Sequence, residues 1–232
     1  MKKLIIIPAY NEEDSIEKLL NELDNNYKEY DYLVVNDCSK DATKAILQKR
    51  NAPYIDLPTN LGIGGGVQSG YIYAYENGYD IAIQMDGDGQ HMPEYLQEIV
   101  LPIEKKEADF VVGSRFIKNE GFQSSAIRRV GINFLSNVLR MLTGVRVYDI
   151  TSGFRAVNRT CIELFANEYA QDYPEPEALA LAAMKGIRIK EVAVQMKERD
   201  GGVSSISGFK SIYYMIKVTL ALIITTYANK RK

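Results

Sequence analysis

The sequence predicts a single α/β domain with a mainly parallel, twisted sheet and helices on both of its faces. Short apolar runs alternate along the chain with longer stretches in which apolar residues recur at helical spacing. The first runs are uninterrupted, as in strands that are buried on both faces. The composition, 46% hydrophobic and 25% charged over 232 residues, is that of a globular protein. We expect this domain to span residues 1–207 and an amphipathic, basic helix to follow over residues 208–232.

Charge and cysteine usage exclude several classes of partner. The formal net charge is −2, so no global positive field favours a nucleic acid. Cys38 and Cys161 lie far apart in the sequence and indicate neither a zinc site nor a disulfide framework. The apolar run Leu4–Ile7 is too short for the core of a signal peptide. We therefore expect a cytoplasmic protein in a reducing compartment.

The first two predicted strands, Leu4–Ile7 and Tyr32–Val35, each end in polar residues. The carboxyl ends of parallel strands meet at one edge of a sheet, where ligands bind. Tyr10 offers a flat ring for a nucleobase, and Glu12 and Asp37 offer acceptors for base N–H groups or ribose hydroxyls. The alternative for each of these residues is a helix cap or a turn.

Helices are expected to begin at Asp14 or Ser15 and again at Asp41. A third predicted helix, with helical spacing from Val67, follows the glycine-rich stretch of residues 60–66. A glycine-rich turn that enters a helix directs backbone N–H groups and the positive end of the helix dipole at an anion. This stretch matches neither a Walker loop nor the dinucleotide fingerprint. A flexible loop is the alternative.

Two carboxylates, Asp86 and Asp88, follow the apolar-biased run Ile81–Met85. Residues two apart on an extended chain point the same way, so both side chains can aim at one spot beyond the strand. Two like charges that close repel unless a cation lies between them. Mg²⁺ and Mn²⁺ prefer such oxygen ligands, supplemented by substrate phosphates. The alternative is a polar turn. His91 is expected to pack or hydrogen-bond in this loop rather than to bind metal.

Two further charged pairs stand at predicted helix starts. Arg128 and Arg129 precede an apolar helical face, and they either meet a phosphate or form a solvated helix start. Glu175 and Glu177 precede another apolar helix. Acids are stabilised at a helix start by the dipole, which is the structural explanation for this second pair. The functional alternative is a general base held in place by the helix.

In their order, these motifs resemble the family 2 glycosyltransferases, and within them the polyprenyl-phosphate branch typified by dolichyl-phosphate mannosyltransferase. The resemblance covers about residues 3–200. The matching motifs are Pro8-Ala9-Tyr10-Asn11-Glu12, Asn36-Asp37-Cys38-Ser39, Asn60-x-Gly62, Asp86-x-Asp88-x-Gln90-His91, Gly113-Ser114-Arg115, Ser152-Gly153-Phe154-Arg155, and Glu177 with the helix that follows it.

The resemblance implies a GT-A fold, a nucleotide-sugar donor and a divalent cation, Mn²⁺ or Mg²⁺. It implies that a set of matching residues binds the donor. In this set Asp88 would bind the metal, Asp86 would lie beside the ribose or diphosphate, and Gln90 would support their loop. It also assigns a catalytic set. The remaining donor-binding positions are Pro8, Tyr10, Glu12, Asp37, Gly62 and Arg115, and the catalytic set is Asp88, Arg155, Glu175 and Glu177. Arg128 and Arg129 are the candidates for the acceptor phosphate.

The expected reaction is an in-line displacement at the anomeric carbon of the sugar, with inversion. The leading acceptor is a polyprenyl phosphate, of the undecaprenyl type, and the favoured donor is a UDP-sugar. A lipid phosphate is already ionised near neutral pH, so a strong base is unnecessary. A glycan hydroxyl in cell-wall or capsule synthesis is the alternative acceptor, which would need a base, for which Glu177 is the candidate. A remote alternative is a nucleotide-binding module without catalysis.

The tail, residues 208–232, is expected to form an interfacial helix on the cytoplasmic face of the membrane. The apolar stretch after Lys217 is too short to span a bilayer. Lys210 and Lys217 share a second face, and Lys230-Arg231-Lys232 close the chain and favour anionic lipid. Docking on the protein body, on a second copy of the chain or on a small membrane protein is the alternative. The apolar face comprises Phe209, Ile212, Tyr213, Ile216, Leu220, Ile223, Ile224 and Tyr227.

Overall fold

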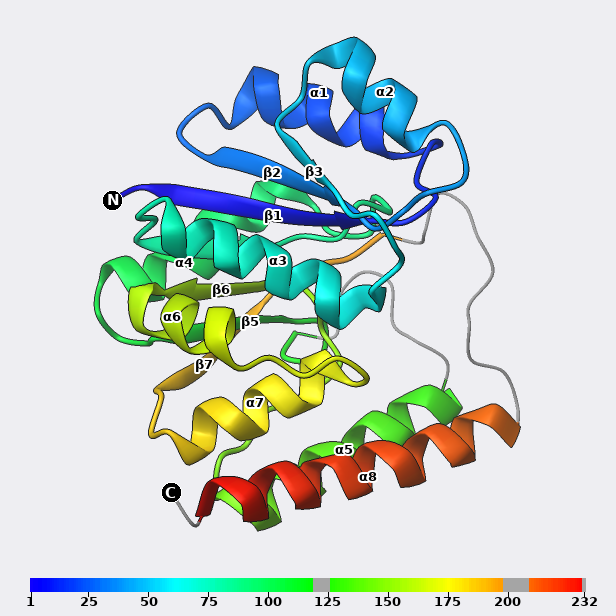
Figure 1. Cartoon of the computed structure of the whole chain (residues 1–232). Coiled ribbons are helices and arrows are strands. Elements are labelled where there is room, and N and C mark those ends of the chain that lie inside the picture. Colours follow the sequence, from blue (N-terminus) through cyan, green and yellow to red (C-terminus); the bar gives the residue numbers. More distant parts are fainter. Residues whose placement is uncertain (119–125, 198–208, 231–232) are drawn as a thin grey trace.

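The computed structural model describes residues 1–118, 126–197 and 209–230, with side chains described over 1–118, 128–197 and 213–230. Within these ranges, a seven-stranded sheet with the order β3-β2-β1-β4-β6-β5-β7 forms the centre of the molecule (Figure 1). The strands are β1 (Lys3–Ala9), β2 (Asp31–Asn36), β3 (Tyr54–Asp56), β4 (Ile81–Gln84), β5 (Phe110–Ser114), β6 (Arg155–Asn158) and β7 (Ile189–Ala193).

The sheet is mainly parallel, as predicted. β1 pairs in parallel with β2 and β4, β2 pairs with β3, and β5 pairs with β7. Only β6 runs against its neighbours β4 and β5 among the described strands. The carboxyl ends of β1, β2 and β4 consequently lie together at one edge of the sheet.

Helices cover both faces of the sheet, which confirms the predicted α/β class. On one side Leu4 and Ile6 of β1 pack with α3, and on the other Ile5 and Ile7 pack with α1 and α4, because successive strand side chains alternate between faces. The helices are α1 (Ile16–Asn26), α2 (Thr43–Arg50), α3 (Gly62–Glu76), α4 (Leu96–Glu104), α5 (Ala126–Thr143), α6 (Arg159–Asn167), α7 (Pro174–Met184) and α8 (Phe209–Lys230), with a 3₁₀ turn at Pro93–Tyr95 before α4.

The glycine-rich stretch differs from its prediction. Its glycines lie inside α3, which begins at Gly62, rather than in a turn before the helix. A Cβ at Gly70, one turn further on, would overlap Ile6 of β1, and a Cβ at Gly64 would overlap the backbone of residues 170–171. The glycines therefore allow α3 to approach β1 and the segment before α7 closely.

The tail helix α8 lies beside α5 and against α7, away from the central sheet (Figure 1). Gly131 of α5 is a point of close approach, because a Cβ there would lie 3.0 Å from Sδ of Met215 on α8. Val218, Leu222 and Thr226 are fully buried on the inner side of α8. The described helices include none that is both long and apolar enough to cross a membrane.

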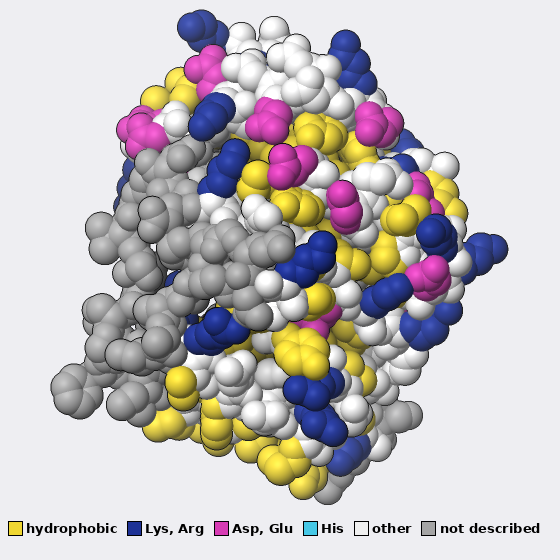
Figure 2. Space-filling view, turned by 180° about the vertical axis from the view of Figure 1, so that it is seen from behind, with side chains coloured by type: hydrophobic (Ala, Val, Ile, Leu, Met, Phe, Trp, Pro, Cys, Tyr) yellow, Lys and Arg dark blue, Asp and Glu magenta, His cyan; other side chains and the backbone are white. Residues whose placement is uncertain are grey.

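The outward side of α5 and α8 is apolar. On α8 the exposed stripe is Tyr213, Ile216, Leu220, Ile224 and Tyr227, as predicted for those residues. The apolar face expected on α5 is divided by the structure: Leu135 and Val138 are buried, whereas Val130 and Phe134 are exposed together with Met141. We call this combined surface the α5–α8 face. Figure 2 shows hydrophobic side chains gathered at this end of the molecule.

Candidate active site

Loops that follow β1, β2 and β4 build the candidate site. Asp37, just after β2, accepts a 2.7 Å hydrogen bond at Oδ1 from the amide of Leu61, and its carbonyl accepts one from the Asn60 side chain. Gly62 begins α3 with a φ of +74°, and its amide donates to Asn60 Oδ1. The Asp37 side chain thus holds the start of α3 at the strand ends. Two other residues that were predicted to bind the donor, Pro8 and Tyr10, lie at the end of β1. Pro8 is buried there and Tyr10 is exposed.

Ser15 joins the loops after β1 and β4. Its hydroxyl donates to the carbonyl of Gly87 at 2.7 Å and lies 3.3 Å from Oε2 of Glu12. Ser15 was expected to cap α1, but its side chain makes no cap hydrogen bond in the structure. The hydroxyl instead fixes the position of the glycine between Asp86 and Asp88. Sequence reasoning missed this role, because the partner lies 72 residues away.

The loop after β4 holds Asp86 and Asp88 in different surroundings. Asp88 is 3% exposed, and its Oδ1 accepts a 3.0 Å hydrogen bond from the amide of Gln90. The amide of Asp86 donates at 2.9 Å to Nδ1 of His91, whose ring stacks on Phe154. Because Nδ1 accepts, the neutral imidazole carries its proton on Nε2, which faces Oδ2 of Asp86 at 3.7 Å. His91 therefore offers no lone pair to a metal in this arrangement.

Space beside Asp86 is kept open by Gly153. A Cβ at Gly153 would lie 2.9 Å from Oδ2 of Asp86 and 3.2 Å from Nε2 of Gln84. The carboxylates of Asp86 and Asp88 are oxygen donors of the kind that suit Mg²⁺ or Mn²⁺. No three His, Cys, Asp or Glu side chains converge as a metal site within the described ranges. A cation here would therefore take its remaining ligands from substrate phosphates or water.

Arg155 begins β6 and is 1% exposed. Its Nε donates to the carbonyl of Ser152 at 2.6 Å, its Nη2 donates to that of Ile150, and its Nη1 has no hydrogen-bond partner among the described residues. The guanidinium lies above the ring of Phe110 and acts electrostatically on Glu175. The resemblance placed Arg155 in the catalytic set. Its burial makes it a source of positive charge behind the site rather than a surface contact.

Glu175 and Glu177 point to different neighbours. Burial raises the pKa of the Glu175 carboxyl, with the positive charge of Arg155 opposing that shift and the negative charge of Asp86 adding to it. Glu177 accepts a 3.0 Å hydrogen bond at Oε2 from the Thr225 hydroxyl of α8. Burial also raises the pKa of Glu177. Glu175 is thus the acid that shares the electrostatic environment of the strand ends, and Glu177 belongs to the contact with the tail helix.

Arg115 is used in a buried ion pair. Its Nε and Nη2 each donate a 2.7 Å hydrogen bond to the carboxylate of Asp149, which is fully buried. Glu191 accepts hydrogen bonds from the backbone amides of Tyr148 and Asp149 and so holds this segment in place. The resemblance assigned Arg115 to the donor phosphates, but two of its donors are engaged with Asp149.

Arg128 and Arg129 lie at the start of α5, and Arg129 lies over the aromatic ring of Phe116. The guanidinium of Arg129 lies 5.3 Å from the centroid of that ring, and that of Arg115 lies at the same distance. Partial burial and the like charge of Arg115 lower the pKa of Arg128, although the residue as a whole remains exposed. Cations that crowd together in this way attract an anion.

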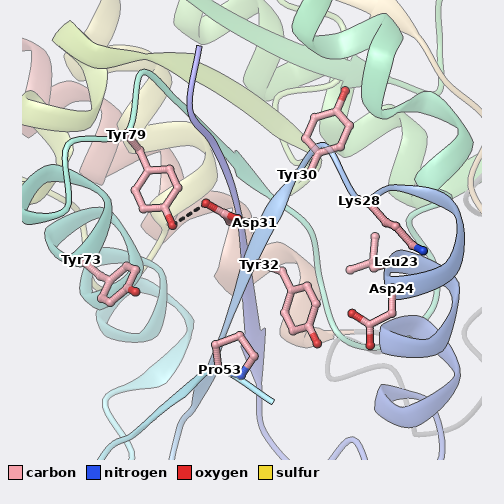
Figure 3. Close-up of a pocket in the computed structure, with 9 residues that line it drawn as sticks. All are labelled: Leu23, Asp24, Lys28, Tyr30, Asp31, Tyr32, Pro53, Tyr73 and Tyr79. Atoms are coloured by element: carbon pink, nitrogen blue, oxygen red, sulfur yellow. Dashed lines mark hydrogen bonds between the residues drawn. The ribbon is translucent and has the colours of Figure 1, made fainter. Parts of the chain in front are cut away.

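A separate hollow of about 510 Å³ lies at the opposite end of the sheet. It is lined by the start of β2, the end of α1 and part of α3, and four of its nine lining residues are tyrosines. Figure 3 shows the Tyr79 hydroxyl directed at Asp31, to which it donates at 3.0 Å. Asp31 begins β2, whereas Asp37 follows its other end, so this hollow is not part of the candidate site.

The fold and the polar loops at these strand ends define a glycosyltransferase. The chain belongs to glycosyl transferase family 2, whose family model matches residues 4–164. An undecaprenyl-phosphate mannosyltransferase of Micrococcus luteus is 33% identical to it, over 90% of this chain and 88% of the relative. A UDP-N-acetylglucosamine–dolichyl-phosphate N-acetylglucosaminyltransferase of Methanococcus voltae is 30% identical, over 95% of this chain and 97% of that protein.

Solved structures share the fold. Glucosyl-3-phosphoglycerate synthase from Mycobacterium tuberculosis, crystallised with phosphoglyceric acid, superposes with a TM-score of 0.70 over 98% of this chain and 79% of that one, at 19% identity. A complex of the same synthase with Mn²⁺, UDP-glucose and phosphoglyceric acid gives a TM-score of 0.71 at 17% identity, over 97% of this chain and 79% of that one. The expected GT-A fold is thereby confirmed.

Proposed function

We propose that the protein transfers a sugar, with inversion, from a nucleotide-diphosphate sugar to a polyprenyl phosphate at a membrane surface. The observation that carries this proposal is that Arg128 and Glu175 both lie near the tail helix α8. Tyr214, on α8, interacts electrostatically with both of them, and α8 carries the exposed apolar α5–α8 face. A lipid lying on that face would then have its phosphate near Arg128 and Glu175. The names of the relatives, which include two polyprenyl-phosphate glycosyltransferases, support the same substrate class.

The donor would bind across the ends of β1, β2 and β4. Tyr10 supplies an exposed ring for the base, with Glu12 and Asp37 nearby in the loops that Asn60 and Ser15 hold together. UDP is the favoured nucleotide, because the synthase that shares the fold was crystallised with UDP. The same synthase was also crystallised with Mn²⁺ and UDP together, which supports Mn²⁺ or Mg²⁺ as the cation here.

Asp88 and Asp86 would hold that cation. When bound, it supplies Lewis-acid neutralisation of the diphosphate that departs. The backbone amide of Gln90 donates to the Asp88 carboxylate, and Nδ1 of His91 accepts a hydrogen bond from the backbone amide of Asp86. Arg155 adds positive charge from behind the site, and we assign it a positioning role. The loop is thereby preorganised before the donor arrives.

The acceptor phosphate oxygen attacks the anomeric carbon as the bond to the diphosphate oxygen breaks, and the electron pair leaves with the nucleoside diphosphate. The chain contributes mainly the alignment of these two groups. A phosphate that is already ionised gives up no proton, so no strong base is required. We propose Glu175, rather than Glu177, as the acid that orients the reacting sugar.

The α5–α8 face is the proposed membrane contact. Lys217 lies over the ring of Tyr213 at 4.6 Å, and Lys230 over that of Tyr227 at 5.5 Å, so each lysine lies beside an exposed tyrosine of the apolar stripe. Apolar side chains flanked by tyrosine and lysine are typical of helices that lie in the interface of an anionic bilayer. The side chains of Phe209, Lys210 and Ile212, and residues 231–232, lie outside the described part of the chain.

A panel of nucleotide sugars tests the reaction. The full chain is incubated with each donor, with Mn²⁺ or Mg²⁺, and with either undecaprenyl phosphate or soluble glycans, and the products are separated by chromatography. We expect a glycolipid phosphate from at least one UDP-sugar. Transfer to glycan hydroxyls alone would contradict the proposal and favour the cell-wall or capsule alternative.

Flotation with vesicles that contain anionic lipid tests the membrane contact. Ile216→Glu with Ile224→Glu should reduce flotation, because it places charge on the α5–α8 face without touching the buried side of α8. Leu101→Glu is the matched control, since Leu101 is an exposed apolar residue of α4. Equal flotation of both variants would exclude this face as the membrane contact.

A further inference from the structure

Two neighbouring tyrosines of α8 have different environments. Tyr213 is 60% exposed on the α5–α8 face. Tyr214 is only partly exposed and packs its ring against Tyr173, with the ring centroids 5.4 Å apart and the planes at 77°. Tyr173 immediately precedes α7, two residues before Glu175. Tyr214 therefore reaches from the tail helix to the start of the helix that carries this acid.

The tail helix also contacts α5 next to Tyr214. A Cβ at Gly131 would lie 3.0 Å from Sδ of Met215, the neighbour of Tyr214, so the two helices approach each other closely next to Tyr214. Arg128 lies three residues, about one turn, before Gly131. Tyr214 accordingly interacts electrostatically with Arg128 on one side and with Glu175 on the other.

The chemistry of this position favours hydrogen-bond donation to an anion. Burial, followed by the negative charge of Glu175, raises the pKa of Tyr214 to about 12, so the phenol keeps its proton at neutral pH. Arg128 is a partly buried cation whose pKa is lowered by burial and by the like charge of Arg115. A phenolic O–H group and a guanidinium that interact with each other can share the oxygens of a phosphate.

We propose that Tyr214 binds the acceptor phosphate together with Arg128, so that the tail helix supplies part of the acceptor site. This inference rests on the proposed function and adds a residue that is not part of the matching family motifs. α8 would thus carry the lipid on its outer side and bind the lipid phosphate with a side chain from its inner side. The lipid chain and its phosphate would then contact the same helix.

Equilibrium binding tests the proposal without requiring turnover. A short-chain polyprenyl phosphate in detergent micelles is titrated into the full chain by calorimetry, with the matching polyprenol as a second ligand. Tyr214→Phe should bind the phosphate about tenfold more weakly, the size of effect expected for a hydrogen bond to a charged group, and should bind the polyprenol as the parent does. Tyr75→Phe is the control, because Tyr75 lies in the last turn of α3, far from the tail helix.

A second measurement separates binding from folding. Tyr214→Phe keeps the ring that packs on Tyr173, so its melting temperature and its flotation with vesicles should match those of the parent. When Tyr214→Phe is combined with Arg128→Gln, the loss of phosphate affinity in the double variant should differ from the sum of the losses in the two single variants, because both groups contact one ligand. Additive losses would overturn the proposal.

The outcomes distinguish the inference from the function on which it rests. If the parent binds polyprenyl phosphate and Tyr214→Phe binds it equally well, the role of Tyr214 is wrong and the proposed function stands. If the parent binds polyprenyl phosphate and polyprenol with equal affinity, the role of Tyr214 and the proposed function are both wrong.

Discussion

The hydroxyl of Thr225 on α8 donates a 3.0 Å hydrogen bond to Oε2 of Glu177 on α7. Glu177 is therefore part of the contact between the tail helix and the domain. Glu177→Gln keeps an acceptor for Thr225 and should retain most of the transfer rate to a lipid phosphate. Glu175→Gln should lower kcat by about 10²-fold or more, as for a residue that orients the reacting groups. Steady-state rates of the two variants decide between these acids, and loss of transfer in Glu177→Gln would refute the assignment.

The raised pKa of Glu177 should make the stability of the folded protein depend on pH. Burial raises its pKa in the folded protein above the ordinary value, so its contribution to stability is present at low pH and is lost as pH rises through the folded pKa. Glu177→Gln has no such loss. The stability of the variant relative to that of the parent should rise as the pH increases above the ordinary pKa of a glutamate, measured by urea unfolding at several pH values. A difference that stays constant with pH would contradict this prediction.

Asp149 should be essential for folding rather than for catalysis. Asp149→Asn removes the charge that balances Arg115 in a fully buried pair, which should cost about 3–5 kcal/mol of unfolding free energy. Glu107→Gln breaks the exposed pair with Lys190 and should leave stability unchanged. Denaturant titration of both variants measures the difference. Equal stability of Asp149→Asn and the parent would show that Arg115 does not need this partner.

Gly153 should control the affinity for the cation. In Gly153→Ala the new Cβ would crowd Oδ2 of Asp86 and displace that carboxylate. We expect the Mn²⁺ concentration for half-maximal activation to rise roughly tenfold, as when other residues that orient metal ligands are changed. The melting temperature reports separately whether the variant has lost its packing. An unchanged activation curve would mean that Asp86 does not contribute to the cation site.

The parts of the fold with regular sequence patterns were predictable. β1, β2, β4, β5 and β7 all coincide with apolar or alternating runs, and polar residues follow the first three. β6 was missed because it begins with Arg155 and contains only two apolar residues, and β3 because it has three residues. Helix α6, which follows β6 directly, was missed as well. Tertiary contacts with β4 and β5, rather than local preference, form β6.

The motifs predicted a candidate site at the edge where the carboxyl ends of the parallel strands meet, but the side-chain partners could not be inferred from them. Glu175 and Glu177 stand two residues apart on a helix, about 200° around its axis, so they cannot both face one site. The sequence does not say which one does, because the answer depends on where α8 packs. The partner of Arg115 was likewise hidden, since Asp149 lies 34 residues away. Tyr214 was missed because it lies off the apolar stripe of its helix.

The central claim, a divalent cation held at the carboxyl end of β4, is tested most directly by metal removal and restoration. Release of nucleoside diphosphate from the preferred donor in the presence of polyprenyl phosphate is measured for chelator-treated protein and again after Mn²⁺ is added back, with the parent and with Asp88→Asn. We predict that release by the parent stops on chelation and recovers with Mn²⁺, and that Asp88→Asn stays inactive at the same Mn²⁺ concentration. Undiminished release after chelation, or full activity of Asp88→Asn, would contradict the account.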